Sequence, residues 1–185
     1  MNIGIVVFDG FTDLDFYLPW DLLNRVRLLN LAPEWQVYIL GDSKVLQSTA
    51  GLSLMPTQDY AFANQCDAVL FCSGPLTRKL SQDPAFLDQF QLNSSKQVLA
   101  AIDSGALILA ALGVLKGKKA TTYPTAFAEL AQLGAIPVRT SFVVDGAATA
   151  SRCLSGEKLA LWMIEKLVGE QIANKVYQTV APLEE

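Results

Sequence analysis

The sequence predicts an α/β fold of the flavodoxin-like type, with a doubly wound, mostly parallel sheet and helices on both faces. Short apolar runs rich in β-branched residues alternate with helical segments along all 185 residues, which is the pattern of successive βα units. Hydrophobic residues make up 51% of the chain, enough for a sizeable core. A chain of this length usually folds as one unit, so we expect a single domain over residues 1–185.

The elements follow from the apolar pattern and from the residues that start and stop helices. Buried strands are expected at residues 3–8, 35–40, 68–72 and 97–102. Helices are expected from Thr12 to about residue 29, after the cap signal at 81–84, at 106–113 and at 155–168. Antiparallel segments are expected at 45–55, around Gly51, and at 141–150, turning at Asp145 and Gly146.

The start of the first helix carries two carboxylates. Thr12 is a suitable N-cap, and Asp13 and Asp15 fall in the first turn, where the positive end of the helix dipole favours negative charge. Pro19 predicts an irregularity close to this end.

Asp103 stands where such a fold would place a nucleophile. It follows the strand at 97–102 and precedes the apolar helix at 106–113, the layout of a nucleophile elbow. Ala101 and Gly105 supply the small residues that the tight turn requires. Because ligands bind at the carboxyl ends of the strands in open α/β sheets, we expect Asp103 at the centre of a pocket.

Composition excludes several partners. The formal net charge is −4 and Lys116–Lys119 is the sole basic run, which reads as a solvated turn, so no nucleic-acid partner is expected. The apolar run at 98–115 contains Asp103 and Ser104, which argues against a membrane span. The cysteines lack metal or disulfide spacing, and no leader pattern precedes residue 3, so we expect a cytoplasmic protein without a metal or organic cofactor.

The chain resembles the ThiJ/PfpI superfamily, with its class I glutamine amidotransferase-like fold, and within it the bacterial isonitrile hydratases. The matching segments are Phe8-Asp9-Gly10, Leu14-Asp15-Phe16, Ser73-Gly74-Pro75, Ile102-Asp103-Ser104-Gly105-Ala106 and Ala120-Thr121-Thr122. The resemblance covers nearly the whole chain. It implies a flavodoxin-like fold, a small-molecule ligand or substrate, and a homodimer.

The residues that carry the chemistry of that superfamily differ here. The resemblance implies a cysteine at the elbow, where this chain has Asp103, and often a histidine where it has Tyr123. The chain contains no histidine, so no Cys-His or Ser-His couple can form, and a protease role is disfavoured. A pair of glycines in those proteins corresponds here to Ser73 and Gly74.

A pair of carboxylates remains. By the resemblance, Asp15 is the acidic partner that faces Asp103, and two close carboxylates share a proton. Such a pair is suited to hydrating a small electrophile such as an isocyanide, with the amides of Gly74 and Ser104 stabilising developing charge. The remaining expected oxyanion or pocket residues are Ser73, Gly105, Tyr123 and Trp20.

Alternatives stay open at Asp103, Asp15, Trp20 and Tyr123, and Tyr123 is also suited to pack as an aromatic residue with its hydroxyl at the surface. Asp103 is also suited to cap the next helix through the amides of Gly105 and Ala106, and Asp15 to complement the helix dipole. Trp20 is equally suited to line the pocket, to lie at a dimer interface or to pack in the core. If Asp103 and Asp15 have only these structural roles, the alternative function applies: the chain is a catalytically inactive homologue that acts as a small-molecule-binding or stress-related module.

Overall fold

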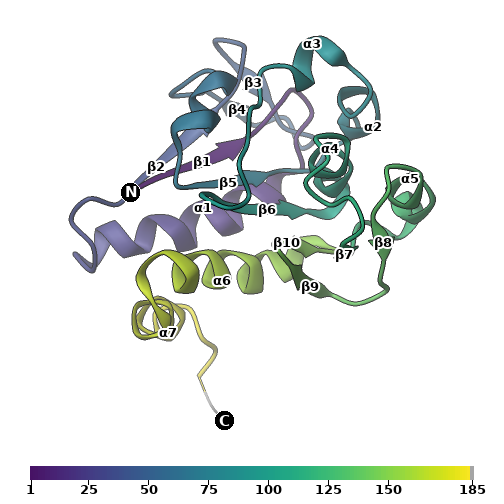
Figure 1. Cartoon of the computed structure of the whole chain (residues 1–185). Coiled ribbons are helices and arrows are strands. Elements are labelled where there is room, and N and C mark those ends of the chain that lie inside the picture. The colour runs from purple at the N-terminus through teal and green to yellow at the C-terminus, as the bar shows by residue number, and fades with distance from the viewer. Residues whose placement is uncertain (184–185) are drawn as a thin grey trace.

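The computed structural model describes residues 1–183 and places a six-stranded sheet between two layers of helices (Figure 1). The strand order is β2 (Gln36–Leu40), β1 (Asn2–Val6), β5 (Ala68–Phe71), β6 (Val98–Ile102), β10 (Ala147–Ala150) and β9 (Phe142–Asp145). Neighbouring strands are parallel except β9, which pairs antiparallel with β10 at the edge. The predicted flavodoxin-like α/β class is confirmed.

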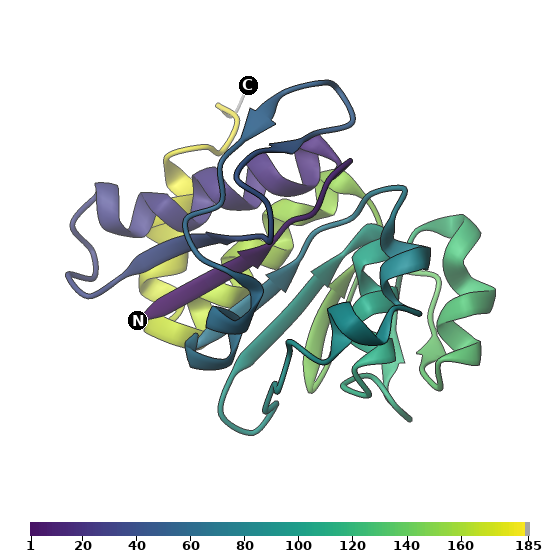
Figure 2. The ribbon, with the colours of Figure 1, turned by 90° about the horizontal axis from the view of Figure 1, so that it is seen from above.

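Both faces of the central strands are buried, and residues alternate between them with the period of two that a strand imposes. One face carries Ile3, Ile5, Leu70, Ala100 and Ile102, and it packs on α1 (Asp13–Leu28), α6 (Gly156–Val168) and α7 (Glu170–Gln178). The opposite face carries Val6, Val69, Phe71, Leu99 and Ala101. Viewed from above, α1 and α6 lie on the far side of the twisted sheet (Figure 2).

Shorter helices cover the second face and the rim of the sheet. They are η1 (Tyr60–Gln65), α2 (Thr77–Leu80), α3 (Pro84–Leu87), α4 (Ala106–Ala111) and α5 (Phe127–Gln132). The 3-10 turns η2 (Asp103–Gly105), η3 (Pro124–Ala126) and η4 (Cys153–Ser155) lie between longer elements. Two small sheets complete the fold: the β3 (Leu46–Gln47) and β4 (Ser53–Leu54) hairpin, and the parallel pair β7 (Lys119–Ala120) and β8 (Ile136–Pro137).

Most expected elements are present with ends shifted by a residue or two. The hairpin at 45–55, the strand pair at 141–150 with Gly146 at φ 76°, and the helix capped by Asp83 are confirmed. Helices α2, α5 and α7 and the β7 and β8 pair were not predicted. Helix α7 follows α6 after the single residue Gly169, which ends α6 at a φ of 94°.

Pro19 lies inside α1 without ending it. Proline has no amide hydrogen for the carbonyl four residues earlier, so the carbonyl of Asp15 lacks its helical partner. The thiol of Cys72, at the end of β5, donates to that carbonyl at 3.5 Å instead. The expected irregularity therefore ties the first turn of α1 to the sheet.

Within residues 1–183, no helix has both the length and the apolar character needed to cross a bilayer. The apolar run at 98–115 divides into strand β6, the turn η2 and helix α4, as the sequence predicts.

Candidate active site

Asp103 occupies a backbone conformation typical of an exposed elbow residue. Its φ is 55°, in the left-handed region, and among residues 1–183 the sole other non-glycine residue there is Asn30. Aspartate and asparagine tolerate this region better than most side chains. The sharp turn between β6 and α4 therefore projects the Asp103 side chain from the carboxyl end of the sheet.

Contacts on both sides hold this turn in place. A Cβ atom on Gly105 would lie 2.5 Å from the carbonyl oxygens of Phe71 and Cys72, so only glycine lets α4 begin this close to β5. The Thr122 hydroxyl donates to the carbonyl of Asp103 at 2.9 Å. The amide of the neighbouring Thr121 donates to Thr149 Oγ1 on β10 at 2.8 Å, which ties this segment to the sheet.

Asp15 lies behind Asp103, as the resemblance implies. Its side chain is fully buried, and Ser73 Oγ donates to its Oδ2. Its other oxygen, Oδ1, has no hydrogen-bond partner among residues 1–183. One carboxylate oxygen from each of Asp15 and Asp103 and the Sγ of Cys153 all lie within 4.8 Å of one another.

The surroundings favour the neutral form of these groups. Burial, followed by the negative charge of Asp15, raises the pKa of Asp103 to about 7, opposed by its hydrogen bond with Ser104. Burial also raises the pKa of Asp15, against the effect of the Ser73 hydroxyl. The pKa of the Cys153 thiol rises to about 12 through burial and the two carboxylates. At neutral pH, Asp103 therefore exchanges its proton readily, whereas Cys153 keeps its own.

The two expected oxyanion donors differ in availability. The Ser104 amide donates to Asp103 Oδ1 at 2.6 Å, so the carboxylate already occupies it. The predicted cap bonds from the amides of Gly105 and Ala106 are absent in the described chain. Asp103 itself begins the 3-10 turn, so its short side chain reaches only the adjacent amide.

Gly74 keeps a free donor beside the elbow. Its amide has no acceptor among residues 1–183. A Cβ atom there would lie 2.4 Å from the carbonyl oxygen of Gly10, which requires glycine at this position. The backbone amide of Gly74 can therefore donate to a molecule in front of Asp103.

A cavity of about 360 Å³ lies over the elbow. Its walls include the predicted residues Ser73, Gly74, Asp103, Ser104 and Tyr123. Asp15 is sealed off beneath them. The size is suitable for a small organic molecule, and Asp103 is the carboxylate that faces it.

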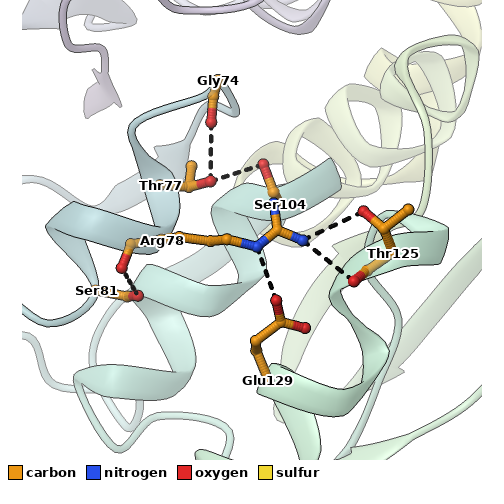
Figure 3. A network of polar contacts seen from close by, with 7 residues as sticks. All are labelled: Gly74, Thr77, Arg78, Ser81, Ser104, Thr125 and Glu129. Atoms are coloured by element: carbon orange, nitrogen blue, oxygen red, sulfur yellow. Dashed lines mark hydrogen bonds and ion pairs between the residues drawn. The ribbon is translucent and has the colours of Figure 1, made fainter.

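Arg78 lies on the wall of this cavity, and the sequence did not indicate it. Its guanidinium donates to Glu129 Oε1 at 2.7 Å and to the carbonyl and hydroxyl of Thr125 at 3.1 and 3.2 Å (Figure 3). The hydroxyl oxygen of Thr77, the preceding residue, lies 2.9 Å from the hydroxyl oxygen of Ser104 and 2.9 Å from the carbonyl oxygen of Gly74 (Figure 3). The start of α2 thus links the cavity wall to the elbow.

Two of the expected pocket residues, Trp20 and Gly105, are not among the described residues lining the cavity. Trp20 stacks on Phe16 with ring centroids 5.6 Å apart and packs against the core. Asp9 accepts the amide of Gln47 at 2.8 Å and shapes the hairpin connection. A second hollow, of about 420 Å³, lies over α6 and α7, away from the elbow.

Cys153, Thr122 and Arg78 come from segments remote in sequence from the elbow. The structure places Cys153 on the cavity wall. For Thr122, the sole signal in the sequence was that it belongs to Ala120-Thr121-Thr122, one of the segments that match the superfamily. Arg78 had none, because a surface arginine on a short helix is common.

A flavodoxin-like sheet with a left-handed residue at the strand-to-helix turn, beneath a small cavity, defines an α/β protein of the nucleophile-elbow class. Comparison with known families takes this further. Residues 1–166 match the DJ-1/PfpI family, and the chain belongs to that family.

Individual relatives agree with this assignment. The chain is 30% identical over 179 residues to the isonitrile hydratase of Pseudomonas putida, covering 95% of this chain and 76% of that protein. A ThiJ/PfpI family protein from Pseudomonas syringae is similar with a TM-score of 0.85 and 25% identity, over 99% of this chain and 76% of that one. DJ-1 of Schizosaccharomyces pombe has a TM-score of 0.81 at 18% identity, over 99% and 100% of the two chains, and supports the fold alone.

Proposed function

We propose that this protein hydrates a small electrophile of the isocyanide type, with Asp103 in place of a cysteine nucleophile. The observation that carries the proposal is the Asp103 carboxyl, which faces a small cavity with a pKa raised to about 7. A general acid or base works best when its pKa is close to the working pH. The 30% identity to an isonitrile hydratase supports the choice of electrophile.

The addition of water to the isocyanide carbon needs two proton transfers, and one carboxyl group can perform both in turn. Protonated Asp103 first gives its proton to the isocyanide carbon. The oxygen of a water molecule then forms a bond to that carbon, while the Asp103 carboxylate takes a proton from the water. The resulting imidic acid becomes the formamide as its hydroxyl proton moves to nitrogen, and Asp103 is again protonated.

The surrounding groups have separate roles in this scheme. The intermediate that forms after protonation is positively charged, so the carboxylate of Asp103 stabilises it. Asp15 does not reach the cavity, and it acts through Asp103 as a positioning residue that keeps the neighbouring pKa near neutrality. The free Gly74 amide is placed to hold the attacking water or the product oxygen.

The test is hydration of cyclohexyl isocyanide to its formamide by the purified protein, with Asp103→Asn beside it. Asparagine tolerates the same backbone conformation but cannot exchange a proton. We expect kcat/KM to fall by a factor of about 100 or more, the usual contribution of general acid and base catalysis. Asp88→Asn, which replaces an exposed carboxylate just after the end of α3, is the matched control and should keep full activity. Full turnover by Asp103→Asn would contradict the proposal.

A second function is favoured by the occupied Ser104 amide and the missing elbow thiol, which leave fewer groups for catalysis. In that case the cavity binds a small molecule without converting it. Turnover by Asp103→Cys alone, with none by the native protein, would support this binding role.

A further inference from the structure

We propose that Asp15, Asp103 and Cys153 together form a binding site for a divalent transition-metal cation such as Zn²⁺. The three residues come from α1, η2 and η4, and their ligand atoms lie within 4.8 Å of one another. Ligand atoms about 2.0 to 2.3 Å from a tetrahedral zinc ion are roughly 3.3 to 3.8 Å apart. Small side-chain rotations therefore suffice to close the site around an ion.

An independent feature points to a missing ligand. Asp15 is fully buried, and its Oδ1 has no partner in hydrogen-bonding geometry among residues 1–183, although the Cys153 thiol lies close enough to lower the pKa of Asp15. Buried carboxylate oxygens almost always have partners, so an orphaned one indicates a water or an ion. Its other oxygen accepts from Ser73, which fixes the orientation of the carboxylate as a supporting residue does at a metal site.

Charge around the cluster also favours a cation. None of the ion pairs found in residues 1–183 includes Asp15 or Asp103. Arg78, the cation on the cavity wall, is paired with Glu129 at 2.7 Å. Arg152, the residue before η4, lowers the pKa of Asp103 by its charge but is exposed to solvent. A bound divalent ion would supply the buried positive charge that these carboxylates lack.

The ligand types select the class of metal. On binding, the cation displaces the proton that the Cys153 thiol otherwise keeps. The resulting thiolate is a soft ligand, and with two carboxylates it suits Zn²⁺ or Co²⁺ rather than Mg²⁺ or Ca²⁺, which require all-oxygen sets. Three protein ligands leave a fourth position, and Asp103 and Cys153 both line the cavity. That position therefore opens toward the cavity, as in zinc sites that keep an exchangeable ligand.

The experiment is a titration of the chelator-treated full chain with Co²⁺, followed by competition with Zn²⁺. We expect one ion per chain, a near-ultraviolet thiolate-to-cobalt charge-transfer band, and loss of that band when Zn²⁺ displaces Co²⁺. Cys153→Ser should remove the band and weaken binding at least tenfold. Asp103→Asn should weaken binding by a similar factor while keeping the thiol.

The matched control is Cys66→Ala, a buried thiol in the core cluster on the opposite face of the sheet, which should keep both band and stoichiometry. Circular dichroism of each metal-free variant checks that it folds. A band that persists in Cys153→Ser, or a native protein that binds no Co²⁺, would overturn the assignment. A bound ion would hold Asp103 as a carboxylate and prevent it from donating a proton, so the hydration assay of the proposed function is run in chelator. Since no readout of the metal titration uses hydration, failure of the proposed reaction leaves this test unaffected.

Discussion

At the scale of single residues, the site depends on one carboxyl group that is held where its charge is unfavourable. Asp103 is 8% exposed, lies next to Asp15, and has a strained, left-handed backbone. Such a residue reduces the stability of the fold, and selection for function is the usual reason for keeping one. The same features that make Asp103 reactive therefore predict how the protein responds to pH.

Asp103→Asn should make the protein more stable at neutral and alkaline pH. In the unfolded chain Asp103 loses its proton near pH 3.8, but in the folded protein near pH 7. Between these values the folded state binds more protons, so the free energy of unfolding falls as pH rises and then levels off. At about 1.4 kcal/mol per pH unit the upper limit is about 4 kcal/mol, and we expect about 2 kcal/mol because Asp15 shares the proton.

Urea unfolding of both proteins in chelator from pH 4 to pH 8 measures this difference. The native protein should lose stability up to about pH 7, and Asp103→Asn should show a smaller loss. Asp88→Asn serves again as the exposed control, with the native pH profile. Parallel profiles for native protein and Asp103→Asn would show that the carboxyl is not held neutral.

At the scale of elements, the elbow depends on how closely α4 approaches β5. Gly105 has helical angles, φ −56° and ψ −24°, so its role is spatial and not conformational. The carbonyl oxygens of Phe71 and Cys72 occupy the place of a Cβ atom. Backbone atoms of a central strand cannot move aside as a flexible side chain does.

Gly105→Ala should therefore destabilise the protein by on the order of 3 kcal/mol, at the upper end of overpacking effects. Gly156→Ala is the matched control, because Gly156 also has helical angles at the start of a helix, φ −61° and ψ −28°. Its nearest neighbour is the flexible end of Ile102, at 3.0 Å, and we expect a loss below about 1 kcal/mol. Equal losses in the two variants would show that the contact with β5 is unimportant.

At the scale of the whole molecule, the sheet separates two apolar clusters and brings the ends of β1, β5 and β6 to one edge. The strands predicted at 3–8, 68–72 and 97–102 are those that form the site, so the main frame followed from the apolar pattern. The short elements did not, since α2, α5 and the β7 and β8 pair are stabilised by packing and not by local preference.

The homodimer remains a proposal that rests on the resemblance. For a chain of 20.1 kDa we expect a mass of about 40 kDa, twice 20.1, in light scattering coupled to size-exclusion chromatography. A mass near 20 kDa across the accessible concentration range would contradict it.

The sequence by itself determined the fold class and the elbow position of Asp103, and its resemblance to the ThiJ/PfpI superfamily implied Asp15 and Gly74 as neighbours of that residue. These depend on strand and helix periodicity and on motifs contiguous in the chain. The tertiary structure alone decided that Ser104 donates to Asp103, that Trp20 packs in the core, and that Arg78 and Cys153 line the cavity. The physical reason is that Asp15, Asp103 and Cys153 are far apart in the chain. Only the parallel pairing of the strands that precede them brings the carboxyl ends of those strands to one edge of the sheet.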